Sequence, residues 1–199
     1  MDKKIKIGEI VNVAGIDHIV LDVLGDNVLC LTRDFAYEGT IFDDDSNNYA
    51  KSSIRRMLNS EYLDKLSAVV GEENIIPAEI NLTSDDGLDD YGKVTDKVGL
   101  LTADMYRKYN RIIEQYPVNV WWWLSTPWST PHRGYRFSVR VVDGDGSLSN
   151  YYCFIEFGVR PFREKVRKSK LYAEIRTLLS KEYITFLLNF VFGILYDRL

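Results

Sequence analysis

Cysteine, histidine and long apolar stretches are all scarce in this chain. Its 199 residues include two cysteines and two histidines, and Cys30 and Cys153 lie far apart, outside any CxxC pair. A disulfide framework, a thiolate zinc site and a CxxC redox centre are therefore excluded. The net charge of −4 argues against a nucleic-acid partner, because such proteins need a basic surface to displace counterions from phosphate. No metal site and no cofactor are predicted.

Two segments bear on membranes and location. The N-terminal segment Met1–Val11 lacks an apolar run long enough for a signal peptide. Tyr183–Tyr196 carries no charged residue, but it is shorter than the roughly 20 residues that a membrane-spanning helix needs. We therefore expect no membrane insertion, and a chain that resides in the cytoplasm or in a particle assembled there.

Aromatic residues are plentiful, with 13 Tyr, 9 Phe and 4 Trp. Tyr and Trp provide large contact areas with few torsions to immobilise, which suits both protein cores and recognition surfaces. The other bulk properties, 46% hydrophobic and 27% charged residues, are those of an ordinary globular protein. The length predicts one large domain, or one domain with an appendage.

The first half of the chain predicts a small antiparallel meander followed by a helix. Glu9–Val13, His18–Leu24 and Val28–Leu31 are short apolar segments separated by glycine-containing turns. Leu31–Asn48 is polar and acidic and is predicted to be a loop. Ser52 or Ser53 is the expected N-cap of a helix with an apolar stripe at three- and four-residue spacing. The stripe consists of Ile54, Met57, Leu58, Tyr62, Leu63 and Leu66.

The middle of the chain predicts a short strand, an acidic loop and a second helix. Ile75–Leu82 is predicted to be the strand and Thr83–Asp96 the loop. Four aspartates of this loop could gather around a cation or simply be solvated, namely Asp85, Asp86, Asp89 and Asp90. Thr102 is the expected N-cap of the helix, which should end near Tyr116 before Pro117.

From Trp121 onward the pattern becomes β and aromatic. Tyr135–Val141 alternates apolar and polar residues, which predicts a half-buried strand. Asp143–Gly146 is a strong turn signal, and Leu148–Phe157 is the expected partner strand. His18 lies among apolar residues, where a structural role is expected rather than a catalytic one.

Two motifs bound this β-rich segment. Trp121-Trp122-Trp123 must point to both faces of a strand, so the three indoles either pack on both sides or place at least one at the edge of a binding surface. At the other end, Gly158-Val159-Arg160-Pro161 suggests a fixed turn in which Arg160 pairs with a buried carboxylate or with carbonyl groups.

These motifs, with the Asp-Gly hairpin between them, resemble a bacterial and phage family with the formylglycine-generating-enzyme type of C-type lectin fold. Ser53–Asn59 resembles the first helix of that family and Val98–Thr102 the segment before its second helix. The resemblance spans about Ile5–Phe162. It implies an α+β, C-type-lectin-like domain over residues 1–162, in which two helices flank an irregular antiparallel sheet. Residues 163–199 would then form a helical C-terminal appendage.

Members of this family include the variable proteins of diversity-generating retroelements, which display a mutable face to protein or cell-surface ligands. The resemblance implies such a face at residues 129–157 and a phage or prophage setting. The residues expected to bind the ligand are Trp128, His132, Arg133, Tyr135, Arg136, Arg140, Ser149, Asn150, Tyr151, Tyr152 and Phe154.

Two rival functions stay open: a carbohydrate-binding or adhesin module on the same fold, and an enzyme of the formylglycine-generating type. The enzyme is disfavoured because its pair of C-terminal cysteines is reduced here to Cys153, and its iron-dependent relatives need more histidines. The calcium-binding motifs of animal C-type lectins do not occur. Asp143–Gly146 begins like an EF-hand loop, but Phe154 stands at the twelfth position, where that loop needs a carboxylate. We therefore expect no catalytic residue.

The apolar C-terminal tail is expected to pack on its own domain or, preferably, between subunits of a homo-oligomer. The alternative is a membrane-surface role for its basic residues, Lys165, Arg167, Lys168 and Lys170.

Overall fold

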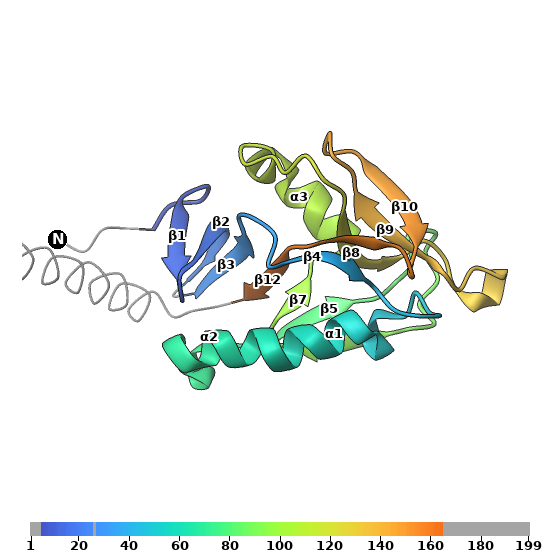
Figure 1. Ribbon diagram of the computed structural model, residues 1–199, viewed down its shortest axis with the longest axis horizontal. Helices are drawn as coiled ribbons and strands as arrows, with labels where there is room; N and C mark the ends of the chain where they lie inside the picture. Colours follow the sequence, from blue (N-terminus) through green and yellow to red (C-terminus); the bar gives the residue numbers. More distant parts are fainter. Residues whose placement is uncertain (1–4, 26, 165–199) are drawn as a thin grey trace, which may run out of the picture.

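The computed structural model describes residues 5–25 and 27–164, which form an α+β fold made mostly of strands (Figure 1). The strands are β1 (Ile10–Val13), β2 (Ile16–Leu24), β3 (Asn27–Thr32), β4 (Tyr37–Ile41), β5 (Ala78–Asn81), β6 (Lys93–Asp96), β7 (Gly99–Leu100), β8 (Trp122–Pro127), β9 (Ser138–Val142), β10 (Leu148–Tyr152), β11 (Glu156–Val159) and β12 (Pro161–Glu164). The α-helices are α1 (Ser53–Met57), α2 (Leu63–Val70) and α3 (Ala103–Ile113).

The first sheet has the order β1-β2-β3-β12-β7, and its pairings are antiparallel. The meander expected from the N-terminal sequence is confirmed as β1, β2 and β3. Strand β12 comes from the far end of the described chain and pairs with β3 on one side and β7 on the other. It continues through Arg163 and Glu164, past the domain boundary expected at Phe162. The predicted tail beyond Glu164 lies outside the described residues.

The second sheet has the order β10-β9-β8-β11-β4. Strands β9 and β10 form the expected hairpin, with Asp143–Gly146 at its turn. Strand β11 runs parallel to β8 and antiparallel to β4, so the expectation of one antiparallel sheet is wrong in two respects. There are two five-stranded sheets, and one pairing is parallel. Strands β5 and β6 form a separate antiparallel pair.

Both predicted helix N-caps are confirmed. The Ser52 hydroxyl accepts a hydrogen bond from the Arg55 amide at 3.2 Å, and Thr102 does the same for Met105 at 3.1 Å. Helix α3 ends at Ile113, short of the expected Tyr116.

Helices α1 and α2 are joined by a π-helical turn, Leu58–Tyr62. There the Asn59 amide donates to the carbonyls of Arg55 and Val98, at 3.1 and 2.9 Å. This insertion into the helical ladder explains the irregularity and ties the helix to the segment before β7. In Figure 1 the α1–α2 segment runs along one side of the molecule, past the two ends that carry β1–β3 and β9–β10.

Three loop and strand expectations are wrong. Strand β4 lies within Leu31–Asn48, which reads as a loop because its strand residues are mostly half-exposed and depend on pairing with β11. Strand β6 likewise lies within the acidic segment Thr83–Asp96. The strand expected at Tyr135–Val141 begins at Ser138, and four of its five residues are buried, so it is not half-buried. These are cases in which tertiary pairing overrides the local pattern.

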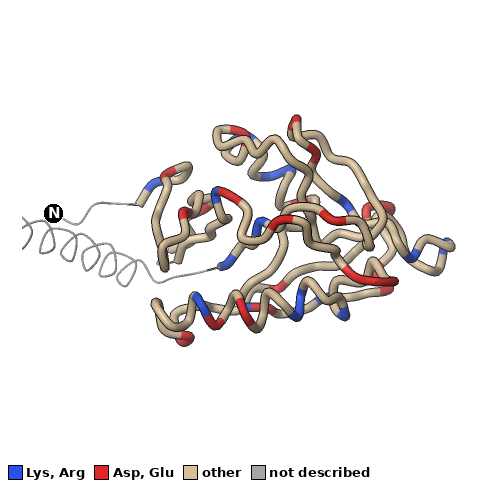
Figure 2. Tube along the Cα trace, viewed as in Figure 1, with Lys and Arg blue, Asp and Glu red and all other residues tan. Residues whose placement is uncertain are grey.

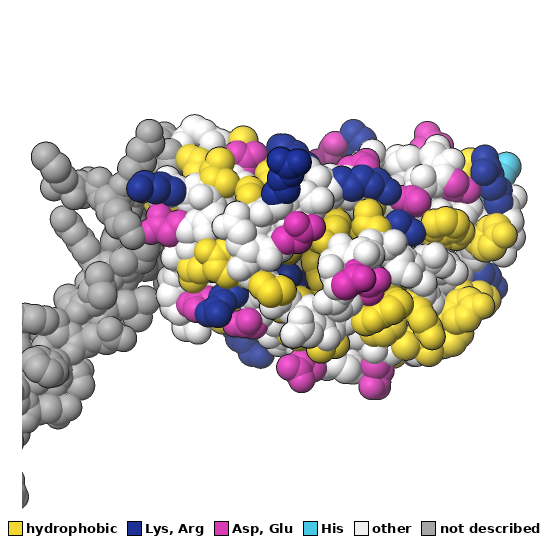
Figure 3. Space-filling view, turned by 90° about the horizontal axis from the view of Figure 1, so that it is seen from above, with side chains coloured by type: hydrophobic (Ala, Val, Ile, Leu, Met, Phe, Trp, Pro, Cys, Tyr) yellow, Lys and Arg dark blue, Asp and Glu magenta, His cyan; other side chains and the backbone are white. Residues whose placement is uncertain are grey.

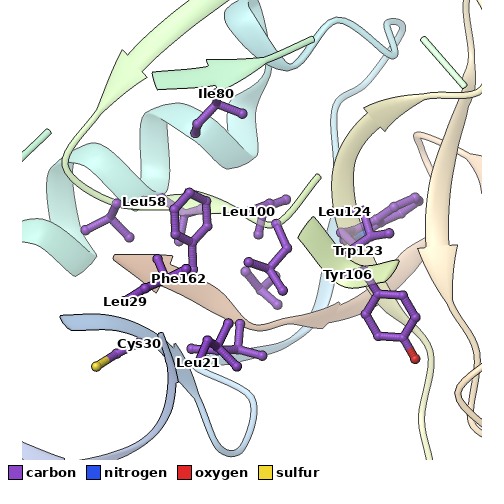
Figure 4. Close-up of a cluster of buried hydrophobic side chains, with 14 of the residues drawn as sticks. Leu21, Leu29, Cys30, Leu58, Ile80, Leu100, Tyr106, Trp123, Leu124 and Phe162 are labelled. Atoms are coloured by element: carbon purple, nitrogen blue, oxygen red, sulfur yellow. The ribbon is translucent and has the colours of Figure 1, made fainter. Parts of the chain in front are cut away.

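The core is continuous from the first sheet to the second. Figure 4 shows Phe162 of β12 among Leu29, Leu58 and Leu100, so residues from four distant parts of the chain meet there. Gly99 permits this contact, because a Cβ at that position would lie 2.4 Å from Ile80 and 3.1 Å from Phe162. Figure 2 shows acidic and basic residues distributed over the described chain, with a short acidic run at Asp43–Asp45.

The tryptophan triplet packs on both faces of the second sheet. Trp122 is 1% exposed and contacts the α3 side through Tyr106, with ring centroids 5.7 Å apart. Trp123 is fully buried, contacts Phe42 at 5.6 Å and donates from Nε1 to the Thr40 carbonyl at 2.8 Å. Trp121 is half-buried and lies at the surface. Two members of the triplet are therefore core residues, and the third is partly exposed.

We predict that Trp122→Ala lowers the free energy of unfolding by about 3–5 kcal/mol, because it removes a fully buried indole. The matched control is Trp128→Ala, which removes an exposed indole and should cost less than about 1 kcal/mol. Denaturant unfolding of both variants measures the difference. Equal destabilisation would contradict the burial of Trp122.

Candidate functional site

A continuous group of aromatic side chains covers the surface at the β9–β10 end of the molecule. This aromatic patch consists of Trp121, Phe137, Tyr151, Tyr152, Phe154 and Phe157. Figure 3 shows it within a broad hydrophobic area at that end. Tyr151, Tyr152 and Phe154 are 41%, 53% and 46% exposed, whereas the other three are half-buried. A group of exposed aromatic side chains this large marks a binding surface more often than a random surface feature.

Direct ring contacts join the members of the patch. Trp121 stacks on Phe157 with centroids 5.5 Å apart, and Tyr151 meets both rings edge-on at 5.8 and 5.3 Å. Tyr152 stacks on Phe154 at 5.4 Å with an interplanar angle of 9°. Such contacts contribute about 0.5–1.5 kcal/mol each beyond area burial, so the rings hold one another in place.

The patch stands on a rigid base. Phe157 contacts the buried Trp123 at 5.0 Å, which connects the surface rings to the core. Cys153, which lies between Tyr152 and Phe154 in the sequence, is fully buried. Its amide donates to the Phe137 carbonyl at 2.7 Å, and its carbonyl accepts from the amides of Phe42 and Asp43. Because this backbone is pinned, the side chains on either side of Cys153 are held outward.

The expected ligand-binding residues divide into three groups by exposure. Those exposed are Trp128, His132, Arg133, Tyr135, Arg136, Asn150, Tyr151, Tyr152 and Phe154. Ser149 is half-buried. Arg140 is 8% exposed, so its assignment as a display residue is wrong. Its guanidinium lies 5.3 Å from the Trp128 ring and 3.7 Å from the Asp85 carboxylate, as a support beneath the surface.

The expected single face is also split by the geometry of the hairpin. Asn150 pairs with Arg140, whereas Tyr151 pairs with Val139 and Ser149 with Val141. Cross-strand partners share a face and successive residues alternate, so Asn150 and Arg140 face the side opposite to Tyr151. Trp128 lies with Arg140 on that opposite side. Ring contacts at the end of β10, rather than a shared strand face, join Tyr151 to Tyr152 and Tyr152 to Phe154.

A hollow of about 220 Å³ lies at the centre of the hairpin surface, lined by Ser138, Asn150, Tyr151 and Tyr152. The Arg136 guanidinium lies 4.6 Å from the centroid of Phe137, which adds a cation to the aromatic surface. The site thus combines apolar rings with hydroxyl, amide and guanidinium groups.

Three of the four aspartates of the acidic loop, Asp85, Asp86 and Asp90, are engaged with protein groups. The Asp85 carboxylate pairs with Arg107 at 2.7 Å, and that of Asp86 accepts from the hydroxyls of Ser84 and Ser129. These hydrogen bonds, from Ser84 first and then Ser129, lower the pKa of Asp86. The described residues contain no group of three His, Cys, Asp or Glu side chains arranged for a metal ion.

The acidic loop in turn supports the loop after β8. Asp90 accepts from the Thr130 hydroxyl, and Arg133 lies 3.2 Å from the Asp86 carboxylate. Asn47, which is fully buried, donates to the carbonyls of Ser129 and Ser138 and accepts from the Tyr91 hydroxyl. The sequence offers no signal for this role of Asn47, because the residue stands in a polar segment that reads as an ordinary loop.

Sequence reasoning did not assign Trp121, Phe137 and Phe157 to the binding face, although it allowed one tryptophan of the triplet to lie at the edge of such a face. The alternation of Trp121 with the buried Trp122 was the available signal, since neighbouring strand residues face opposite ways. No comparable signal marks Phe137, which directly precedes β9, or Phe157, which lies in β11.

The groups most able to react are held in inert settings. Burial raises the pKa of the Cys30 and Cys153 thiols to about 11, so both are protonated at neutral pH. Burial lowers the pKa of His18 well below 6.5, and the charge of Arg163 lowers it further. The His18 Nδ1 atom lies 2.8 Å from the Ile16 carbonyl, which agrees with its expected structural role.

Arg160 was expected to pair with a buried carboxylate or with carbonyl groups, and the structure shows carbonyl groups as its partners. The side chain is 1% exposed and donates to the Thr32 carbonyl at 3.2 Å and the Arg33 carbonyl at 2.8 Å. Gly158 of the same motif has no room for a side chain, because a Cβ there would lie 2.4 Å from the Phe35 ring.

Comparison of the chain with family models, with curated proteins and with solved structures found no match. Within residues 5–25 and 27–164, no helix has the length and apolar character needed to cross a membrane.

We predict that Asp86→Ala lowers the melting temperature, because it leaves Ser84, Ser129 and Arg133 without their shared acceptor. Asp89→Ala is the matched control: Asp89 is exposed in the same loop, and its side chain makes no hydrogen bond to a described residue. Thermal unfolding followed by circular dichroism compares the two variants.

The same measurement tests for a cation. Addition of EDTA or calcium should leave the melting temperature of the unmodified chain unchanged, because Asp85, Asp86 and Asp90 already interact with protein groups. A calcium-dependent rise would show that an ion binds the folded state and would contradict this assignment.

Proposed function

We propose that this chain is a recognition domain that binds a protein ligand through the aromatic patch. The observation that carries the proposal is the unbroken series of ring contacts from Trp121 to Phe154, whose outermost rings are about half exposed. Tyr and Trp are enriched at protein interfaces, and Arg136 and Asn150 add hydrogen-bonding groups beside them.

The rigid support of the patch favours binding. Immobilising flexible side chains upon association costs about 0.5–1.5 kcal/mol for each. Here the Trp123–Phe157 contact and the pinned Cys153 backbone have already fixed the rings, so that cost is reduced. The exposed rings are therefore the natural anchors of an interface, surrounded by polar groups that complete it.

The C-type-lectin-like scaffold is part of the proposal. The two motifs that carry the resemblance are neighbours in space, since the Gly158 amide donates to the Trp121 carbonyl at 2.9 Å and Arg160 lies over the Trp122 ring at 5.1 Å. A display segment that starts and ends at adjacent points of a framework can change without moving that framework. This arrangement supports a binding face built between the two motifs.

A carbohydrate-binding module is the second candidate, because exposed tyrosines also stack on sugar rings. The observation that favours it is the hollow lined by Ser138, Asn150, Tyr151 and Tyr152, which offers hydroxyl and amide groups beside aromatic ones. The formylglycine-generating enzyme is a weaker candidate, since Cys153 is the lone cysteine near the candidate site and is buried.

Replacement of Tyr135, Arg136, Tyr151 and Tyr152 together by alanine should abolish binding and leave the fold intact. Surface substitutions cost within about 0.5 kcal/mol each, so the melting temperature should change little. Binding is measured with peptides selected from a random display library against the unmodified chain. Peptides that bind the patch should not bind the quadruple variant. They should still bind a control variant with Lys51→Ala, just before α1, and Lys65→Ala, in α2.

A glycan array probed with the same proteins separates the two candidates. Glycan binding that depends on Tyr151 and Tyr152, without selectable peptides, would replace the protein-binding proposal by the carbohydrate one. A quadruple variant that unfolds would show that these side chains belong to the core, and the assignment of the patch would fail.

Diversification of the binding face by a retroelement predicts a pattern in the flanking DNA. A near-copy of the codons for residues 121–162 should lie beside a reverse-transcriptase gene and differ from them at adenines. Its substitutions should fall at exposed positions such as Tyr135, Asn150 and Tyr152, while the codons for Arg140 and Cys153 stay constant. A sequenced locus without such a copy would remove the retroelement and leave the binding face in place.

A further inference from the structure

A second candidate site lies on the other face of β8 from the aromatic patch. There a cavity of about 310 Å³ opens between the end of α3, the segment before β8 and the β9–β10 turn. Its lining residues include Tyr106, Ile113, Glu114, Trp122, Asp143 and Arg160. Small-molecule sites span about 300–1,000 Å³, so this cavity suits a ligand at the small end of that range.

The cationic part of the cavity wall is Arg160. A guanidinium carries five N–H groups, and the Thr32 and Arg33 carbonyls accept from two nitrogens, Nε and Nη2. Among the described residues, no group accepts from Nη1 and no carboxylate forms an ion pair with Arg160. Burial lowers the pKa of Arg160 to about 10, which reflects the loss of hydration around this charge. A bound carboxylate would compensate a buried charge that carbonyl groups alone satisfy only in part.

Three carboxylates lie at the same cavity: Glu114, Asp143 and Asp145. The Asp143 Oδ1 atom accepts from the amides of Asp145 and Ser147, and Asp145 Oδ1 also accepts from Ser147. The Asp145 carboxylate also forms hydrogen bonds with the side chains of Ser147 and Asp143, which lower its pKa. The exposed Glu114 side chain accepts no hydrogen bond from a described residue. The cavity therefore offers acceptors for a cation as well as a donor for an anion.

We propose that this cavity binds a free α-amino acid with an apolar side chain. The ligand carboxylate accepts from Arg160, and its ammonium group donates to the Glu114 carboxylate, with Asp143 and Asp145 adding negative charge nearby. The apolar side chain packs against Trp122, Tyr106 and Ile113. A simple anion would be repelled by three carboxylates and a simple cation by Arg160, so the pattern of charge selects a molecule that carries both.

The cavity is held open by contacts that do not involve a ligand. The Tyr106 hydroxyl donates to the Gly146 carbonyl at 2.6 Å, which fixes α3 to the hairpin turn. Gly144 packs against the segment before β8, since a Cβ there would lie 3.2 Å from the Asn119 carbonyl oxygen. A preformed cavity binds without the cost of ordering its walls.

Isothermal titration of the full chain with two amino acids and their singly charged analogues tests the proposal. The probes are L-phenylalanine, phenethylamine and 3-phenylpropionate, and L-leucine with isoamylamine and 4-methylvalerate. At least one amino acid should bind saturably, and each of its two analogues should bind about tenfold or more weakly, because each lacks one charged contact. Failure of both amino acids to bind, or an analogue that binds as tightly as its amino acid, would overturn the proposal.

The Glu114→Gln variant localises the site. Glu114 is exposed, so the substitution should leave the melting temperature unchanged. It should weaken the binding of the amino acid and of the amine. It should not weaken the binding of the carboxylate analogue. Glu61→Gln, which removes an exposed carboxylate from the α1–α2 segment, is the matched control and should bind as the unmodified chain does. Amino-acid binding that Glu114→Gln does not weaken would place the ligand elsewhere and refute this assignment.

The outcome is independent of the aromatic patch. The quadruple alanine variant at Tyr135, Arg136, Tyr151 and Tyr152 should bind the amino acid normally, because none of these residues lines the cavity. Loss of peptide binding with retained amino-acid binding separates the two sites.

Discussion

Strand β8 is the element on which both candidate sites depend. Its adjacent residues Trp122 and Trp123 are buried on opposite faces, so the strand has a core on either side. Trp123 supports the aromatic patch through Phe157, while Trp122 forms the wall of the cavity with Tyr106 and Arg160. Because Gly158 pairs in parallel with Trp122, the returning chain is fixed to the same strand before it crosses to the first sheet.

The buried Arg160 explains how that crossing is stabilised. Its side chain leaves the second sheet and donates to the Thr32 and Arg33 carbonyls, at the end of β3 in the first sheet. A buried cation without a described carboxylate partner costs solvation energy, and the Trp122 ring and two carbonyls offset only part of that cost. The Arg160 guanidinium, which joins the two sheets, therefore keeps N–H groups available at the cavity that it lines. The residue that stabilises the fold is thus also the proposed contact for a ligand carboxylate.

The sequence predicted well those features that depend on neighbouring residues. The caps at Ser52 and Thr102 and the turn at Asp143–Gly146 need only local chemistry, and all three are present. Features that depend on distant partners were missed. Strand β4 exists because β11 pairs with it, and Arg140 is buried because Trp128 and Asp85 cover it. The position of a side chain in a strand pattern does not show which residues from other parts of the chain will cover it.

The division of residues 129–157 into exposed and anchored positions limits how a binding face here could change. Tyr135, Tyr151 and Tyr152 direct about half of their surface to solvent, so replacements there alter the face with little effect on the core. Cys153 lies between exposed neighbours but is fully buried, with a backbone bonded to Phe137 and Phe42. A larger side chain at Cys153 would overpack the core and release the stacked rings beside it. Variation therefore has to skip Cys153, whatever process generates it.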